Sequence, residues 1–197
     1  MKRLIDVTAS AIGLVLLAPV LALIALSIVF TSGLPVVYRQ QRVGRNGVPF
    51  TMLKFRSMVN DAGLPGALIT VGGDPRVTAV GRFLRRHKLD ELPQLINVLR
   101  GDMSIVGPRP EVSKYVDLYT PEQRRVLELS PGITDPASVR YLHEEDELAA
   151  AENPEQLYRR VIMPEKIRIN LEYAEHSSTG SDLGIVLRTI FSIGRNG

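Results

Sequence analysis

The chain has 197 residues, of which 45% are hydrophobic, with a formal net charge of +3 and no cysteine. This length suits one domain with a sizeable core and is short for two, and the missing cysteines exclude a disulfide framework, a thiolate nucleophile and a zinc–thiolate site. Residues 39–100 hold 11 Lys and Arg against 4 Asp and Glu, whereas residues 141–182 hold 4 against 10, so the basic half requires an anionic partner.

The first predicted element is an apolar helix. No charged residue occurs from Val7 to Tyr38, and about 20 apolar residues are enough to cross a bilayer. A cleaved signal peptide fits less well, because its apolar core has only about 7–15 residues. We therefore expect residues 1–36 to form a membrane anchor and residues 37–197 to form the part outside the membrane.

Two placements of this helix stay open. Pro19 removes a backbone hydrogen bond and kinks a helix. Basic residues flank both ends of the apolar segment, and positive flanks favour the cytoplasmic side. A re-entrant helix that bends at Ala18–Pro19 satisfies both flanks, while an ordinary single-pass helix with a tolerated proline is the alternative.

A β-hairpin is predicted next. Two strands, about 36–43 and 48–55, flank the turn dipeptide Asn46–Gly47. Lys54 and Arg56 share a face of the second strand, where they meet either solvent near lipid headgroups or an anionic ligand. Residues 60–73 are rich in glycine and proline and predict a loop without a nucleotide-binding glycine motif.

A basic helix is predicted to start at Asp74–Pro75, with the aspartate as its cap. Its apolar stripe is formed by Val80, Phe83 and Leu84. Its basic face is formed by Arg82, Arg85, Arg86 and Lys88. Such a helix either rests on anionic lipid or uses its arginines to hold a substrate phosphate through their bidentate forks.

Two adjacent acids, Asp90 and Glu91, precede a helix predicted from Pro93 to Gly101. The structural interpretation is that Asp90 caps this helix and that the positive end of the helix dipole stabilises Glu91 in the first turn. The chemical interpretation is that the same helix end attracts phosphate. An ionised carboxylate there can attack phosphorus, or hold Mg²⁺ together with phosphate oxygens.

The turn Gly107–Pro110 follows a short strand predicted to end at Val106, and its two prolines restrict the backbone around Arg109. A solvated arginine needs no such restraint, so an anion-binding role is preferred. The rest of the chain predicts helices within 111–129 and 157–173, a loop at 130–136 and a solvated acidic segment at 143–147. The last predicted helix begins at Asp182 and carries an apolar stripe that packs on the domain or lies on the membrane.

Six motifs in this order resemble the monotopic phosphoglycosyl transferase family, the bacterial sugar transferases, in its small form with only the catalytic domain. The motifs are Met1–Asp6 with Pro19, Lys54–Met58, Leu89–Gln94, Gly101–Ser104, Val106–Pro110 and Pro131–Thr134. The resemblance covers essentially the whole chain. It implies an α+β, mostly helical fold: a re-entrant helix–break–helix anchor and a compact cytosolic domain with a small β-hairpin and interfacial amphipathic helices.

The resemblance also implies a reaction. A sugar 1-phosphate would pass from a UDP-sugar to undecaprenyl phosphate with release of UMP, as the first membrane step of bacterial glycoconjugate synthesis, for example of lipopolysaccharide or exopolysaccharide. The enzyme would work at the cytoplasmic face of the inner membrane and require Mg²⁺. Asp90 would be the nucleophile that forms an aspartyl-phosphosugar intermediate, and Glu91 would ligate Mg²⁺. Arg109 would contact the nucleotide or its phosphate, with Arg85 and Lys54 as further cations.

The chain departs from the family pattern at two places. Ala18–Pro19 stands where Ser–Pro is common, and Asp135–Pro136 stands where Gly–Trp is common, so a sugar preference does not carry over. Anionic lipid is an expected partner and a homodimer is left open, but nucleic acid is not expected, since only 6% of residues are aromatic and none is Trp. The alternatives are a membrane-anchored basic binding protein without catalysis and a nucleotide-sugar hydrolase.

Overall fold

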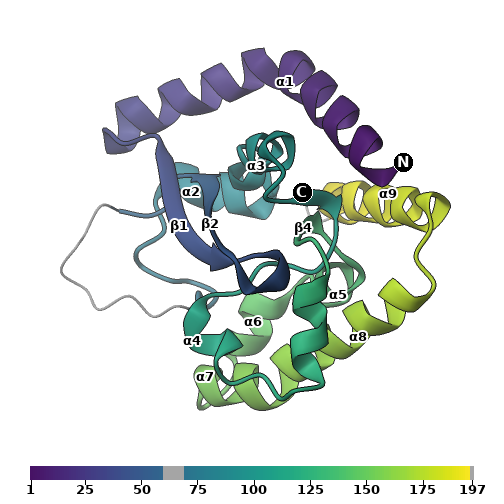
Figure 1. Cartoon of the computed structure of the whole chain (residues 1–197). Coiled ribbons are helices and arrows are strands. Elements are labelled where there is room, and N and C mark those ends of the chain that lie inside the picture. Colours follow the sequence, from purple (N-terminus) through teal and green to yellow (C-terminus); the bar gives the residue numbers. More distant parts are fainter. Residues whose placement is uncertain (60–68, 196–197) are drawn as a thin grey trace.

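A computed structural model describes residues 1–59 and 69–195, and it confirms a mostly helical α+β fold (Figure 1). The strands are β1 (Val37–Val43), β2 (Pro49–Phe55), β3 (Ser104–Val106) and β4 (Gly132–Thr134). The longer helices are α1 (Lys2–Ser32), α2 (Ala79–Arg86), α3 (Gln94–Arg100), α8 (Met163–Glu175) and α9 (Thr179–Arg195). The shorter ones are α4 (Ser113–Val116), α5 (Pro136–Arg140), α6 (Glu144–Ala149) and α7 (Pro154–Leu157).

The apolar helix α1 arches over the other elements and is bent near its middle (Figure 1). It is helical through Pro19, so Ala18 and Pro19, where a break is predicted, lie within one continuous helix. By length and hydropathy α1 is able to cross a membrane, and only 11% of its most apolar stretch is buried. Its placement in a membrane stays a prediction.

Both ends of α1 are bound to the same domain. At the start, Arg3 donates to the carbonyl oxygens of Val98 and Leu99 at 2.5 and 3.0 Å. The buried carboxylate of Asp6 accepts hydrogen bonds from β3. At the far end, Arg56 donates to the carbonyl oxygens of Ser32 and Gly33, each at 2.6 Å. Apolar burial adds to these bonds at the far end, where Ile24, Ile28, Phe55 and Leu84 form one core cluster.

The predicted β-hairpin is confirmed. Strands β1 and β2 pair antiparallel, and Tyr38 lies directly opposite Lys54. Asn46 and Gly47 in the connection have positive φ angles of 56° and 78°, which is the conformation these two residue types tolerate best. The buried Asn97 of α3 accepts from Leu53 N at 3.0 Å and therefore fixes α3 beside the hairpin.

The predicted start of the basic helix at Asp74–Pro75 is wrong. Thr78 is the cap of α2, and its side chain accepts from Gly81 N at 2.9 Å. The carboxylate of Asp74 is instead occupied by the backbone and the guanidinium of Arg76. The predicted loop 60–73 is described only from residue 69 onwards, and its residues 60–68 lie outside the described residues.

The region after Arg109 also differs from the predictions. The helices predicted within 111–129 are present, but only as the short helix α4 and the 3₁₀ helix Gln123–Glu128. The predicted loop 130–136 contains β4, which pairs in parallel with β3, and Asp135 then caps α5 by accepting from Ser138 N. The helix predicted within 157–173 begins with a π-helical stretch, Tyr158–Ile162, and continues as α8 from Met163.

The helix α9 begins at Thr179, three residues before the predicted start at Asp182. The side chain of Asp182 binds Lys2 at the beginning of α1 and the hydroxyl of Tyr173. Of the predicted apolar stripe, Leu183, Leu187, Ile190 and Phe191 are exposed and Val186 is half-buried. The four exposed side chains do not pack on the domain, and a contact of the stripe with a membrane stays a prediction.

Candidate functional site

One cavity of about 1250 Å³ gathers all the predicted catalytic and phosphate-binding residues: Lys54, Arg85, Asp90, Glu91 and Arg109. Its walls come from the β-hairpin, from α2 and the turn after it, from the turn after β3, and from the segment around α5 and α6. Ala18 and Pro19 are not among its lining residues. A cavity with a mixed polar and apolar lining, into which several charged side chains converge, is the most reasonable candidate for a binding or active site.

A sharp reversal of the chain brings the two acids into the cavity. Helix α2 ends at Arg86, and Lys88 then adopts a left-handed conformation with φ of 54°, which is uncommon for a residue with a Cβ atom. The 3₁₀ turn Leu89–Glu91 follows, with Asp90 and Glu91 both buried. Pro93, not Asp90, is the cap residue of α3, and no side chain bonds that helix start. The capping interpretation of Asp90 is therefore wrong.

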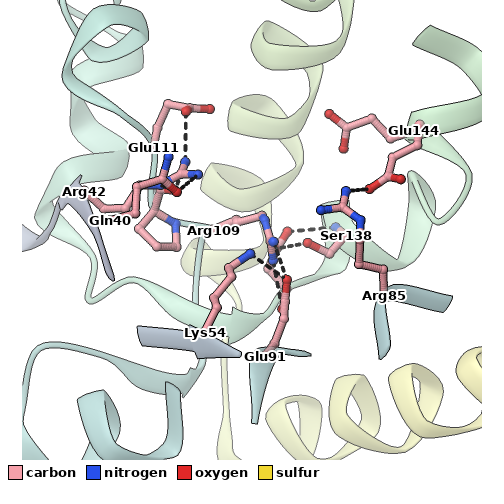
Figure 2. Close-up of polar contacts among 12 residues, drawn as sticks. Gln40, Arg42, Lys54, Arg85, Glu91, Arg109, Glu111, Ser138 and Glu144 are labelled. Atoms are coloured by element: carbon pink, nitrogen blue, oxygen red, sulfur yellow. Dashed lines mark hydrogen bonds and ion pairs between the residues drawn. The ribbon is translucent and has the colours of Figure 1, made fainter. Parts of the chain in front are cut away.

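Glu91 is the centre of an ion-pair cluster (Figure 2). Its Oε1 accepts from Lys54 Nζ at 3.1 Å, and Arg109 donates to both of its oxygens, reaching Oε2 at 3.1 Å. Burial raises the pKa of Glu91, but the charges of Arg109 and Lys54 outweigh it and hold this pKa well below its usual range. In return, Glu91 raises the pKa of Arg109. Glu91 thus stays ionised and fixes two cations at the cavity wall.

Asp90 has the opposite environment. It is buried, and its Oδ1 has no hydrogen-bond partner among the described residues. Burial and the neighbouring charge of Glu91 raise its pKa, although Lys54 and Arg85 act against this shift. A buried carboxylate oxygen without a partner costs stability. Such an oxygen is available to react or to bind.

Arg109 projects from a turn that needs glycine. A Cβ atom on Gly107 would lie 2.2 Å from Ser130 O, and one on Gly132 would lie 2.1 Å from Gly107 N. This close approach lets Gly107 N donate to Thr134 O at 3.0 Å and Gly132 N donate to Pro108 O at 2.9 Å. Two backbone hydrogen bonds therefore join Gly107 and Pro108 to β4 immediately before Arg109.

Arg85 lies in the cavity but does not bind either acid of the pair. Its guanidinium forms an ion pair with Glu145 of α6, and Glu144 forms one with Lys166 (Figure 2 draws the arginine pair). The prediction that residues 143–147 are simply solvated is wrong for these two glutamates, because tertiary packing brings cations to them. Arg85 remains close enough to Asp90 to lower its pKa.

The sequence reasoning did not identify one buried polar group of this cavity, formed by Arg42, Glu111 and Tyr158. In the sequence, Arg42 is one of the basic residues that follow the apolar segment. The alternation of β1 contained a usable signal, because Tyr38, Gln40 and Arg42 occupy the face of the hairpin on which Lys54 lies. Glu111 and Tyr158 had no such signal, since they meet across 47 residues of chain.

Among the described residues, no group of three or more His, Cys, Asp or Glu side chains is arranged to hold a metal ion. Mg²⁺, however, is commonly bound by one or two carboxylates together with substrate phosphates. The unpartnered Oδ1 of Asp90 and Oε2 of Glu91, which accepts one hydrogen bond from Arg109, offer this donor set. The two acids therefore fit an ion shared with a phosphate substrate.

Comparison with known proteins identifies relatives over the full chain. A family model described as bacterial sugar transferase matches residues 1–196. A Caulobacter vibrioides UDP-glucose:undecaprenyl-phosphate glucose-1-phosphate transferase is 42% identical over 195 residues, covering 98% of this chain and 69% of the relative. An Escherichia coli enzyme of the same description is 39% identical, covering 97% of this chain and 39% of the relative. An Aeromonas hydrophila UDP-N-acetylgalactosamine-undecaprenyl-phosphate N-acetylgalactosaminephosphotransferase is 36% identical, covering 98% and 43%.

Proposed function

The chain belongs to the bacterial sugar transferase family, and from this premise we propose that it transfers a sugar 1-phosphate from a UDP-sugar to undecaprenyl phosphate. UMP is released when the sugar 1-phosphate leaves the donor. The names of the relatives support this proposal, since they describe the same donor and acceptor classes. Relatives acting on glucose and on N-acetylgalactosamine both match, so the sugar itself is left to experiment.

The observation that carries the proposal is the contrast between the two adjacent acids. Glu91 is held ionised by Lys54 and Arg109, whereas the Oδ1 of Asp90 is buried and has no partner among the described residues. A carboxylate that is not consumed by ion pairs is a competent nucleophile toward phosphorus. The same cavity supplies the cations that a diphosphate substrate requires.

The proposed reaction has two displacements at one phosphorus atom. In the first, an oxygen of the Asp90 carboxylate bonds to the phosphorus that carries the sugar. The bond from this phosphorus to the bridging oxygen breaks, and UMP leaves with that oxygen. In the second, a phosphate oxygen of undecaprenyl phosphate bonds to the same phosphorus and the bond to Asp90 breaks. The products are the sugar-diphosphate lipid and a free Asp90 carboxylate, so the enzyme is regenerated.

The charges of the cavity support the first displacement. Arg109 is a permanent cation beside Glu91, and its planar fork suits two phosphate oxygens. Lys54 adds a point charge on Oε1 of the same carboxylate, which Arg109 also contacts. Glu91, with Asp90, would hold Mg²⁺ jointly with the substrate, and the ion would offset charge on the transferring phosphoryl group. Arg85 becomes available to phosphate once it exchanges Glu145 for the stronger anion.

A re-entrant anchor at the cytoplasmic face of the inner membrane is part of the proposal. A straight helix of 31 residues would be about 46 Å long, whereas the hydrocarbon core is about 30 Å thick. A spanning helix would hold its ends on opposite faces. Here Arg3 and Asp6 at one end and Ser32 at the other are all bonded to the same domain, which favours a helix that enters and returns.

The exposed apolar stripe of α9 supports a membrane surface at the same level. Lys2 at the start of α1 forms an ion pair with Asp182 of α9, so the two helices meet there, as Figure 1 also shows. The stripe on α9 is therefore proposed to lie in the interface and to hold the cavity near the headgroups of the acceptor lipid.

A direct test follows UMP release from a panel of UDP-sugars, with and without undecaprenyl phosphate, in detergent or nanodiscs. The proposal predicts one preferred donor, multiple turnovers only with the lipid, and a sugar-diphosphate lipid as product. Continuous release of free sugar phosphate without lipid would identify a nucleotide-sugar hydrolase. Salt-sensitive anion binding without any UMP would identify a binding protein without catalysis.

A further inference from the structure

Arg42 is a buried cation that the proposed chemistry does not use. It lies near the end of β1, its side chain is only 16% exposed, and it lines the cavity. Its guanidinium contacts Gln40 on its own strand through Nε at 3.1 Å and Nη2 at 2.7 Å. The remaining nitrogen, Nη1, donates to the Pro110 carbonyl oxygen at 3.1 Å and to Glu111 Oε1 at 3.3 Å. All three nitrogens of this guanidinium therefore have protein partners.

The residues that Arg42 contacts come directly after Arg109. On the other side of Arg109, Gly107 and Pro108 are bonded to β4. The backbone of β1 adds to the second attachment, since Val43 N donates to Glu111 O at 2.8 Å. The chain is thus fixed immediately before and immediately after Arg109. Two fixed neighbours leave the arginine little freedom except in its own side chain.

Glu111 holds Arg42 in this position. Its Oε1 also accepts from Val112 N at 2.8 Å, and its Oε2 accepts from the hydroxyl of Tyr158. Burial lowers the pKa of Arg42, Glu111 raises it, and the nearby charge of Arg109 lowers it further. Arg42 and Arg109 therefore repel each other, while Glu111 neutralises Arg42 and Glu91 attracts Arg109 (Figure 2). Each of the two carboxylates therefore holds one of the two guanidiniums, and the two positive charges stay apart.

We propose that Arg42 is a positioning residue that acts through Arg109: by holding Pro110 and Glu111 it directs the Arg109 fork toward Glu91 and the phosphate that is to be transferred. The inference deepens the proposed function and rests on it. A lysine at position 42 keeps the charge but has a single nitrogen on a flexible stem, so it cannot hold Gln40, Pro110 and Glu111 together. A displacement of about 1 Å in such a group is enough to slow a reaction by up to about a hundredfold.

The test is a double-mutant cycle on kcat/KM for the UDP-sugar, with Arg42→Lys, Arg109→Lys and the double variant. If Arg42 acts through Arg109, Arg42→Lys lowers kcat/KM by about tenfold alone and by less than about twofold in the Arg109→Lys background. Equal losses in both backgrounds would mean that Arg42 acts independently of Arg109, and would overturn the proposal. Arg45→Lys is the matched control, because among the described residues the side chain of Arg45 bonds only Glu128 O, and this variant should retain full activity.

A second measurement does not depend on activity, and it separates this inference from the proposed function. The rate at which phenylglyoxal modifies Arg109 is followed by peptide mapping in wild type, Arg42→Lys and Arg45→Lys. Arg109 should react several-fold faster in Arg42→Lys alone, while the buried Arg56 stays protected. An unchanged rate at Arg109, or a parallel rise at Arg56 that reveals general loosening, would refute the positioning role even if no UMP is ever detected. A faster reaction at Arg109 alone supports it in either case.

Discussion

The sharpest prediction concerns opposite effects on stability from two neighbouring substitutions, Asp90→Asn and Glu91→Gln. Removing one partner from a buried ion pair costs roughly 3–5 kcal/mol, because the other charge is left without compensation. Glu91→Gln leaves the charges of Arg109 and Lys54 without their partner. The Arg109 side chain is 35% exposed to solvent, however, and the Lys54 side chain is 17% exposed. Water relieves part of the cost, so we expect a loss of about 2–4 kcal/mol.

Asp90→Asn should behave differently. The pKa of Asp90 is raised by burial and by Glu91, so its charged form costs stability at every pH above its ordinary value of 3.8. Replacing it with a neutral amide removes this cost. The variant should therefore be as stable as wild type at pH 7, or more stable, although its activity is expected to be lost.

Thermal unfolding of the detergent-solubilised protein at pH 7 measures both effects. For a chain of this size, 2–4 kcal/mol corresponds to a decrease in Tm of about 5–15 °C for Glu91→Gln. Glu155→Gln is a suitable control, since it removes a carboxylate from an exposed pair with Lys114 and should leave Tm unchanged. If Glu91→Gln melts with wild type, or if Asp90→Asn is destabilised as strongly as Glu91→Gln, the assignment of the two acids is wrong.

The stability difference between wild type and Glu91→Gln should depend on pH. The lowered pKa of Glu91 contributes stability that is fully present above its ordinary value of 4.5 and is lost as the pH falls through the depressed value. The difference in Tm between wild type and Glu91→Gln should therefore shrink on acidification below about pH 4.5. A difference that stays constant down to low pH would contradict the depressed pKa.

Three further predictions follow from the fold and the cavity. First, single cysteines introduced as Leu4→Cys and Leu34→Cys, both exposed sites in a chain without native cysteine, should react with an impermeant maleimide from the same side of sealed vesicles; labelling from opposite sides would show a spanning helix. Second, the raised pKa of Asp90 should shift the acidic limb of kcat/KM above the ordinary range of an aspartate, with activity falling as the pH decreases; a limb at about pH 4 or below would argue against an essential ionised Asp90 with a raised pKa. Third, Glu145→Gln should free Arg85 for phosphate and lower KM for the UDP-sugar by a few-fold; an unchanged KM would mean that this ion pair does not compete with substrate.

Much of the site could be predicted from sequence because its signals are local. The β-hairpin follows from alternation and a two-residue turn, and Arg109 is marked by the two prolines around it. The pair Asp90–Glu91 is visible in the sequence and lies in the cavity, but the expected helix cap is not its structural role. The left-handed Lys88 turns them into the cavity, and no local propensity indicates that a lysine adopts this conformation.

The contacts that complete the site join distant parts of the chain. Arg42 meets Pro110 across 68 residues, Arg85 meets Glu145 across 60, and Asp6 meets Ser104 across 98. Charge and spacing do not determine such partners. The start of α2 illustrates the same limit, because Asp74 and Thr78 are both residue types that cap helices well. The close packing of Gly81 against Ser57 favours the start at Thr78, since a Cβ atom added at Gly81 would lie 1.9 Å from Ser57 O.

The attack of Asp90 on the phosphorus of the donor can be tested in a single-turnover experiment. Enzyme is mixed with its preferred UDP-sugar in the absence of undecaprenyl phosphate, and UMP is quantified over the first turnover together with sugar label retained on the denatured protein. Wild-type enzyme should give a UMP burst close to stoichiometric with enzyme, with label on the peptide that contains Asp90, and Asp90→Asn should give neither signal. A normal UMP burst from Asp90→Asn would contradict it.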